Sequence, residues 1–105
     1  MEIGCGIGLF AKVASVFGSY VIATDYKQSV LDLTKVITVC SCYAQINTSN
    51  CPNVEYRLLD LMSDSAYDII LESEKVDLVV AGDMIYDEVL TECMCRVYLF
   101  YLPYE

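Results

Sequence analysis

The first eight residues contain the most restrictive feature of the chain, a run with glycine at every second position. The run, MEIGCGIG over residues 1–8, is followed by an apolar stretch of helical spacing from Leu9. Gly4, Gly6 and Gly8 permit a sharp turn and let a ligand approach the backbone, because no Cβ stands in the way. A helix that begins at Leu9 points its free N–H groups at the same place. The run therefore predicts a strand, a tight turn and a helix that hold a nucleoside-like cofactor.

Four apolar runs of strand length alternate with stretches of helical spacing along the chain. The predicted strands are residues 1–3, 20–24, 54–59 and 76–81, and the predicted helices are 9–17, 29–44, 67–71 and 88–99. A loop is expected at 48–53, where Pro52 stops regular structure. The alternation predicts the α/β class, as a partial, Rossmann-like doubly wound parallel sheet of four strands in the order 3-2-1-4. The fourth strand is expected to be an exposed apolar edge.

The helices also carry predicted caps and buried faces. Ser29 with Asp32 is a capping-box pattern, and Asp87 precedes the last helix as an N-cap. Gly18 is expected to end the first helix. The predicted apolar face of that helix is Leu9, Phe10, Val13, Ala14 and Phe17. The predicted buried side of the second helix is Val30, Leu31, Leu33, Val36, Ile37, Cys40 and Ala44.

A polar residue or a glycine follows each predicted strand. Asp25 ends the second strand, Asp60 the third, and Gly82 with Asp83 the fourth. Ligands of parallel sheets bind beyond the carboxyl ends of the strands, so these residues are expected to share one site with the glycine turn. An acid roughly 20 positions after such a turn accepts hydrogen bonds from ribose hydroxyls, which favours this role for Asp25 over that of a solvated aspartate.

The spacing of the glycines distinguishes between cofactors. A dinucleotide-binding turn has the pattern G-x-G-x-x-G, but here the third glycine, Gly8, comes one residue earlier. An acid, Glu2, also stands two residues before Gly4. The resulting pattern E-x-G-x-G-x-G resembles motif I of the class I, seven-β-strand S-adenosylmethionine-dependent methyltransferases.

The segment after the fourth predicted strand narrows this resemblance. Residues 76–87 read VDLVVAGDMIYD and resemble the D-x-x-Y segment of the methyltransferase-like protein-lysine methyltransferases. Asp83 and Tyr86 match its two fixed letters, and the acids Asp87 and Glu88 that follow are also typical of it. The resemblance extends from residue 2 to about residue 97.

The resemblance implies S-adenosylmethionine as the cofactor and a lysine side chain of a protein as the methyl acceptor. The implied cofactor-binding residues are Glu2, Gly4, Cys5, Gly6, Gly8, Asp25, Tyr26, Asp60, Leu61 and Gly82. Asp83 and Tyr86 are the implied catalytic residues, which shape the substrate channel. Leu61 stands where many relatives carry an aromatic residue beside the adenine, so weaker stacking is expected there.

Composition limits the partners. Fifteen acidic residues against six basic ones give a net charge of −9, which disfavours nucleic acid and favours a basic protein. The chain lacks histidine, and its six cysteines lack zinc-knuckle spacing, so no metal is expected. No apolar run is long enough to span a membrane, and no signal pattern opens the chain. We expect an intracellular protein of the cytoplasm or nucleus with reduced thiols.

Four strands are fewer than the seven of the family that the chain resembles. We therefore expect residues 1–105 to be a single, incomplete S-adenosylmethionine-binding domain that is truncated at both ends, with activity open for this piece alone. Two alternatives stay open. One is a methyltransferase-fold remnant without catalysis that binds cofactor or a partner protein. The other is a methyltransferase that acts on a small molecule or a nucleic acid.

Overall fold

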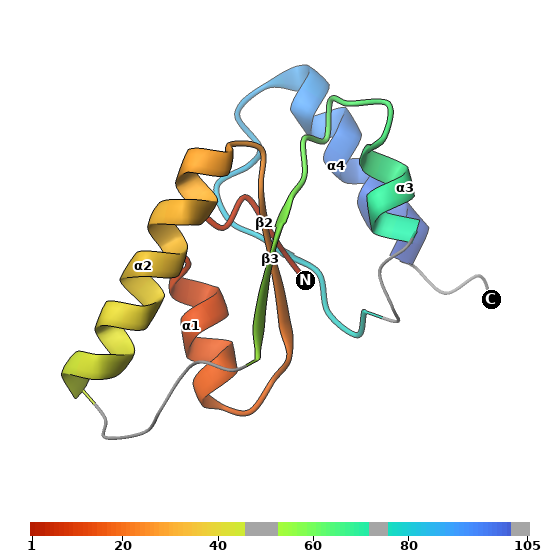
Figure 1. Cartoon of the computed structure of the whole chain (residues 1–105). Helices are drawn as coiled ribbons and strands as arrows, with labels where there is room; N and C mark the ends of the chain where they lie inside the picture. Colours follow the sequence, from red (N-terminus) through yellow and green to blue (C-terminus); the bar gives the residue numbers. More distant parts are fainter. Residues whose placement is uncertain (46–52, 72–75, 102–105) are drawn as a thin grey trace.

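Strands and helices alternate along the chain, and the helices lie on both sides of a parallel sheet in the computed structural model, which describes residues 1–45, 53–71 and 76–101 (Figure 1). The strands are β1 (Glu2–Ile3), β2 (Val21–Asp25), β3 (Val54–Leu58) and β4 (Val80–Ala81). The helices are α1 (Leu9–Val16), α2 (Gln28–Gln45), α3 (Ala66–Leu71) and α4 (Glu88–Tyr101). The α/β class is confirmed. The predicted loop at 48–53 falls almost wholly outside the described residues.

The described strands form one parallel sheet in the order β3-β2-β1-β4. The predicted order 3-2-1-4 is therefore confirmed. Ile3 lies opposite Thr24 on one side and Ala81 on the other. Because all the strands run the same way, the residues that follow Ile3, Asp25, Leu58 and Ala81 gather at one edge of the sheet, which we call the carboxyl edge.

The fourth strand is much shorter than predicted. A strand over residues 76–81 was expected from their apolar composition, but only Val80–Ala81 pair with β1. Val80 lies opposite Glu2, and its N–H donates to the Met1 carbonyl at 2.9 Å. Residues 76–79 lie outside this pairing, although the Leu78 carbonyl accepts a hydrogen bond from the Met1 amino group at 2.7 Å. Apolar, β-branched composition does not make a strand without a neighbour to pair with.

Two apolar cores lie on the two faces of the sheet, and β2 contributes to both. Val21 and Ala23 pack toward α1 and α2 with Leu31, whereas Ile22 packs with Ile70 in the other core. This alternation is the two-residue period of a strand whose faces are both covered. Figure 1 shows the same arrangement, with α1 and α2 on one side of the sheet and α3 and α4 on the other.

Helix α1 turns a different face to the sheet than its apolar residues predict. Ala11 and Ser15 are buried, whereas Leu9 and Phe17 are 67% and 84% exposed. The glycine turn fixes the rotation of the helix, because the Ala11 N–H donates to the buried Glu2 carboxylate at 3.2 Å and so faces β1. The predicted apolar face is therefore wrong for Leu9, Val13 and Phe17, and only Phe10 and Ala14 of that set are half-buried.

The end of α1 is confirmed. Gly18 has a φ of 87°, and its N–H donates to the Ser15 carbonyl at 3.0 Å. The Ser19 N–H donates to the Ala14 carbonyl at 3.1 Å. These two bonds form a Schellman motif, which satisfies carbonyls that the helix itself leaves free.

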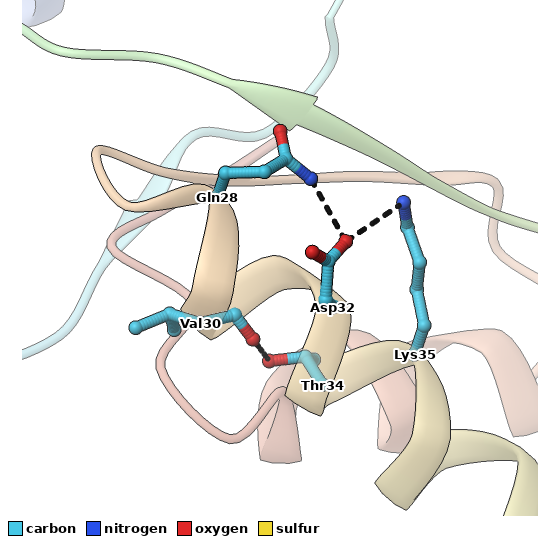
Figure 2. Close-up of polar contacts among 5 residues, drawn as sticks. All are labelled: Gln28, Val30, Asp32, Thr34 and Lys35. Atoms are coloured by element: carbon cyan, nitrogen blue, oxygen red, sulfur yellow. Dashed lines mark hydrogen bonds and ion pairs between the residues drawn. The ribbon is translucent and has the colours of Figure 1, made fainter.

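The predicted capping box of α2 is wrong. The helix begins at Gln28, so Ser29 lies inside its first turn. Asp32 instead accepts a hydrogen bond from Gln28 Nε2 at 2.9 Å and pairs with Lys35 Nζ at 3.8 Å (Figure 2). The start of the helix is held from outside, where the Lys27 N–H donates to Asp25 Oδ1 at 3.2 Å.

The buried side of α2 is also only partly as predicted. Leu31 and Thr34 are buried, whereas Leu33 and Val36 are exposed. Positions three apart share a helical face, so Thr34 belongs with Leu31 although it is not apolar. The side chains of Cys40 and Ala44, predicted to be buried here, lie outside the described residues.

The remaining helices confirm their predictions. Helix α3 begins at Ala66 and ends at Leu71, close to the predicted 67–71. Asp87 caps α4, since its Oδ1 accepts the Leu90 N–H at 3.0 Å. Among the described residues, no helix is long and apolar enough to cross a membrane.

Candidate functional site

The glycine turn at the carboxyl edge adopts a backbone that only glycine takes without strain. Gly4, Gly6 and Gly8 have φ values of 68°, 50° and 73°. The Cys5 N–H between them donates to the Thr24 carbonyl at 2.8 Å, and the Gly8 N–H donates to the Cys5 carbonyl at 2.7 Å. The turn is therefore tied to β2 on one side and folded onto itself on the other.

The glycines of this edge differ in what surrounds them. A Cβ on Gly4 would lie 2.4 Å from Met84 Sδ, so the segment after β4 packs directly on the turn. A Cβ on Gly6 or on Gly82 would meet no atom within 4 Å. The turn is thus supported at Gly4 and open at Gly6. An open, positive-φ glycine backbone is the surface that a ligand can approach closely.

Asp25 joins the second strand to this turn. Its Oδ2 accepts the Gly6 N–H at 3.2 Å, and its Oδ1 accepts the Lys27 N–H at 3.2 Å. The residue is buried, yet each carboxylate oxygen has a further lone pair with which to accept a hydroxyl proton. The structure therefore brings Asp25 and the glycine turn together, as their spacing predicts.

Glu2 lies beneath the turn and holds it in place. Its carboxylate is buried and accepts the Ala11 N–H, which belongs to the first turn of α1. Burial raises the pKa of the Glu2 carboxyl above 4.5, and the Ala11 hydrogen bond and the nearby amino terminus oppose that rise. In the described structure the Glu2 side chain is thus a support that orients α1 on β1.

Cys5 occupies the centre of the turn as a protonated thiol. Its side chain is buried, and burial with the negative charges of Glu2 and Asp25 raises the pKa of the Cys5 thiol to about 11. A thiol of this kind is a weak nucleophile near neutral pH. The backbone N–H of Cys5 holds the turn to β2.

Two threonines that sequence reasoning overlooked complete the support of the turn. The Thr34 hydroxyl lies within hydrogen-bonding distance of the Val30 carbonyl, at 2.7 Å, and of the Gly6 carbonyl. The Thr24 hydroxyl donates to the Glu2 carbonyl at 2.9 Å. Both residues are completely buried. A threonine on an otherwise apolar face was the signal available, because a buried hydroxyl requires a partner.

The third strand contributes a loop in which neighbouring residues face different ways. Asp60 is exposed, and its Oδ1 accepts the Met62 N–H at 3.0 Å. Leu61, predicted to flank an adenine, is buried and packs in the core with Ala66 and Ile70. The exposed apolar side chain of this loop is Met62.

The fourth strand places Gly82, Asp83 and Tyr86 at the carboxyl edge, all exposed to solvent. Asp83 has a φ of 57°, the one positive value among the described non-glycine residues. Left-handed backbone at a residue with a Cβ is typical of positions held by their surroundings. Met84, which packs on Gly4, is what anchors this segment beside the turn.

An aromatic and a basic side chain lie at the start of α2 in the same region. The Lys27 ammonium lies 4.9 Å from the centre of the Tyr26 ring. The Tyr26 side chain raises the pKa of Lys27, and Asp25 and Tyr86 raise it further. Tyr26, Lys27 and Tyr86 thus share one exposed region at the carboxyl edge. Among the described residues, no group of three or more acidic or cysteine side chains could hold a metal ion.

A parallel sheet of order 3-2-1-4, with a glycine turn after its first strand and an acid at the end of its second, defines a Rossmann-like α/β domain. Residues 1–99 of the chain match the model of the lysine methyltransferase family. The chain therefore belongs to the lysine methyltransferase family. Searches of curated proteins and of solved structures found no match.

Proposed function

We propose that this chain binds S-adenosylmethionine at the carboxyl edge of the sheet and belongs to an enzyme that transfers the methyl group to a lysine side chain of a protein. The observation that carries the proposal is the contact between the Gly6 N–H and Asp25 Oδ2, which closes the turn onto the acid at the end of β2. Membership of the lysine methyltransferase family supports the reaction. Within that family, the D-x-x-Y segment favours a likeness to methyltransferase-like protein 22.

The residues present fit such a cofactor. Gly6 offers backbone with no atom within 4 Å of the position a Cβ would take, and Asp25 lies beside it with acceptor capacity left for ribose hydroxyls. Tyr26 and Met62 are exposed apolar side chains on the two neighbouring loops. These are the kinds of group that hold a nucleoside: close backbone, a paired acceptor, and apolar surface for a base.

The cofactor supplies a methyl group that its sulfonium already makes electrophilic. The chain has mainly to position the incoming amine and to remove its hydration. Asp83 and Tyr86 are exposed, and their side-chain oxygens can accept hydrogen bonds from the N–H groups of the lysine amine. These hydrogen bonds would orient the lone pair of the amine toward the methyl group. Since the amine enters as an ammonium, its proton must leave before attack, and these oxygens can pass it to solvent. The chain has no histidine to act as a strong base, which fits an amine better than a hydroxyl acceptor.

The net charge of −9 supports a basic protein as the substrate and argues against a nucleic acid. We further propose that the protein acts inside the cell, in the cytoplasm or nucleus, where its thiols stay reduced. Localisation of a tagged chain by microscopy tests this second part separately.

Two measurements test the proposed function. Titration calorimetry with S-adenosylhomocysteine is expected to show binding by the folded chain. Transfer of a radioactive methyl group to a protein extract is expected to survive nuclease and to be lost after protease. Asp83→Asn and Tyr86→Phe are expected to keep the calorimetric signal and to lose most of the transfer, because both side chains are exposed and neither supports the turn. Binding without transfer by the unaltered chain would favour a cofactor-binding remnant, and no binding would end the cofactor proposal.

A further inference from the structure

The segment that runs from the end of β4 into the first turn of α4 exposes several large apolar side chains that are close together in the sequence. Ile85 is 78% exposed, Tyr86 75% and Val89 56%. We call these three residues the Ile85–Val89 patch. Grouped apolar side chains at a protein surface mark sites of interaction more often than scattered ones.

The patch is fixed beside the glycine turn. Met84, which immediately precedes Ile85, packs on Gly4, and Asp87 caps the first turn of α4 through the Leu90 N–H. The segment is thus anchored at both ends, and Ile85, Tyr86 and Val89 between these contacts are exposed. Anything that binds the patch lies next to the proposed methyl-transfer site.

The charges within this segment indicate what kind of partner the Ile85–Val89 patch can bind. Asp83, Asp87 and Glu88 are exposed and are interleaved with the apolar residues of the patch. A complementary partner carries apolar and basic side chains in turn.

We propose that the Ile85–Val89 patch is the substrate-docking surface, and that it binds an extended protein segment in which the target lysine is flanked by apolar and basic residues. This inference rests on the proposed function. It deepens that function by naming the local sequence that the site selects. Exposed acids beside the patch reject acidic neighbours of the lysine by like-charge repulsion.

Two fluorescein-labelled peptides with a central lysine test the proposal, one with leucine and arginine neighbours and one with serine and aspartate neighbours. Fluorescence anisotropy is expected to show roughly tenfold tighter binding of the leucine–arginine peptide. Val89→Asp and Ile85→Asp are expected to weaken that binding roughly tenfold. Val16→Asp is the matched control, because Val16 is 58% exposed at the far end of α1.

The outcomes separate the two proposals. Equal binding of the two peptides, or equal loss in Val16→Asp and Val89→Asp, overturns the docking surface even where S-adenosylhomocysteine binds and methyl transfer occurs. Absence of S-adenosylhomocysteine binding overturns the proposed function, while the peptide comparison still decides whether the patch selects its partner. Thermal unfolding of each variant shows that the fold is kept. Displacement of the peptide by single-stranded RNA at low concentration would favour a nucleic acid and contradict the proposal.

Discussion

Four glycines that look alike in the sequence have different surroundings, and substitution by alanine separates them. Gly82 has neither a positive φ nor a close neighbour, so Gly82→Ala is expected to leave stability nearly unchanged. Gly6→Ala and Gly18→Ala add only backbone strain, about 1–2 kcal/mol each. Gly4→Ala adds the same strain and a clash with Met84, and is expected to cost the most. Urea unfolding of the four variants measures this order.

The double variant Gly4→Ala with Met84→Ala tests the reason for the order. Relative to Gly4→Ala, it is expected to recover the stability that is lost through the clash with Met84. The loss that comes from the positive φ at residue 4 is expected to remain. Gly18→Ala lies far from the turn along α1, so it is expected to lower stability without lowering affinity for S-adenosylhomocysteine. A Gly4→Ala chain as stable as Gly82→Ala would show that Met84 moves aside without cost.

Glu2 predicts a specific dependence of stability on pH. Its pKa is raised in the folded chain, so between 4.5 and that raised value the folded state binds more protons than the unfolded state. The free energy of unfolding therefore falls as pH rises through this interval. Glu2→Gln is expected to remove this fall, since a neutral amide oxygen can still accept the Ala11 N–H. Urea unfolding over a pH series shows the effect, and parallel curves for the two chains would contradict it.

At the scale of elements, Thr34 connects α2 to the glycine turn, and Thr91 provides a matched comparison. Both hydroxyls lie against a carbonyl one turn earlier in their own helix, that of Val30 for Thr34 and that of Asp87 for Thr91. Only Thr34 also reaches the Gly6 carbonyl. Thr34→Val is expected to cost about 1–2 kcal/mol and to weaken S-adenosylhomocysteine binding. Thr91→Val is expected to leave S-adenosylhomocysteine binding nearly unchanged and to change stability by only a small fraction of the cost of Thr34→Val. Equal effects of Thr34→Val and Thr91→Val on urea unfolding and on calorimetric binding would show that the Thr34 contact with Gly6 does not support the turn.

The two faces of helix α1 are expected to differ in how well they tolerate substitution. Val13→Lys replaces an exposed apolar residue, so it is expected to change stability by less than about 0.5 kcal/mol and to raise solubility. Ala11→Leu inserts a large side chain where Ala11 is completely buried, and is expected to cost about 1–3 kcal/mol. Thermal unfolding of the two variants measures the contrast. A larger loss of stability in Val13→Lys than in Ala11→Leu would mean that α1 buries the apolar face that the residue spacing alone predicts.

The sequence predicted which segments are helices better than which way the helices face. Periodicity located α1, α2, α3 and α4 because it depends on neighbouring residues alone. The rotation of α1 depends on the bond from Ala11 to Glu2, which involves a partner nine positions away that no local pattern contains. Likewise, the described length of β4 follows its pairing with β1, in which Val80 and Ala81 lie opposite Glu2 and Ile3, and not its own apolar run.

At the scale of the whole molecule, strand order and the edge on which the site forms were predictable, since both follow from parallel β-α-β connections. Asp25 and the glycine turn meet as their spacing predicted. The burial of Leu61 between the exposed Asp60 and Met62 was not predicted, because it depends on packing against Ala66 and Ile70 in the core. Thr34 and Met84 escaped prediction because their contacts with the turn arise from packing between elements distant in the chain.

The net charge of −9 makes a final prediction for the molecule as a whole. At 0.01 M salt the Debye length of about 30 Å exceeds the radius of gyration of 14.2 Å, so like charges repel across the fold. At 0.15 M it falls to about 8 Å, and most of that repulsion is screened. Sodium chloride over this range is therefore expected to raise the free energy of unfolding measured with urea. The rise should shrink as the pH approaches the isoelectric point of about 4.2, where the net charge vanishes. A fall in stability with salt at pH 7 would instead mean that attractive ion pairs, such as Arg96 with Glu92, outweigh the repulsion.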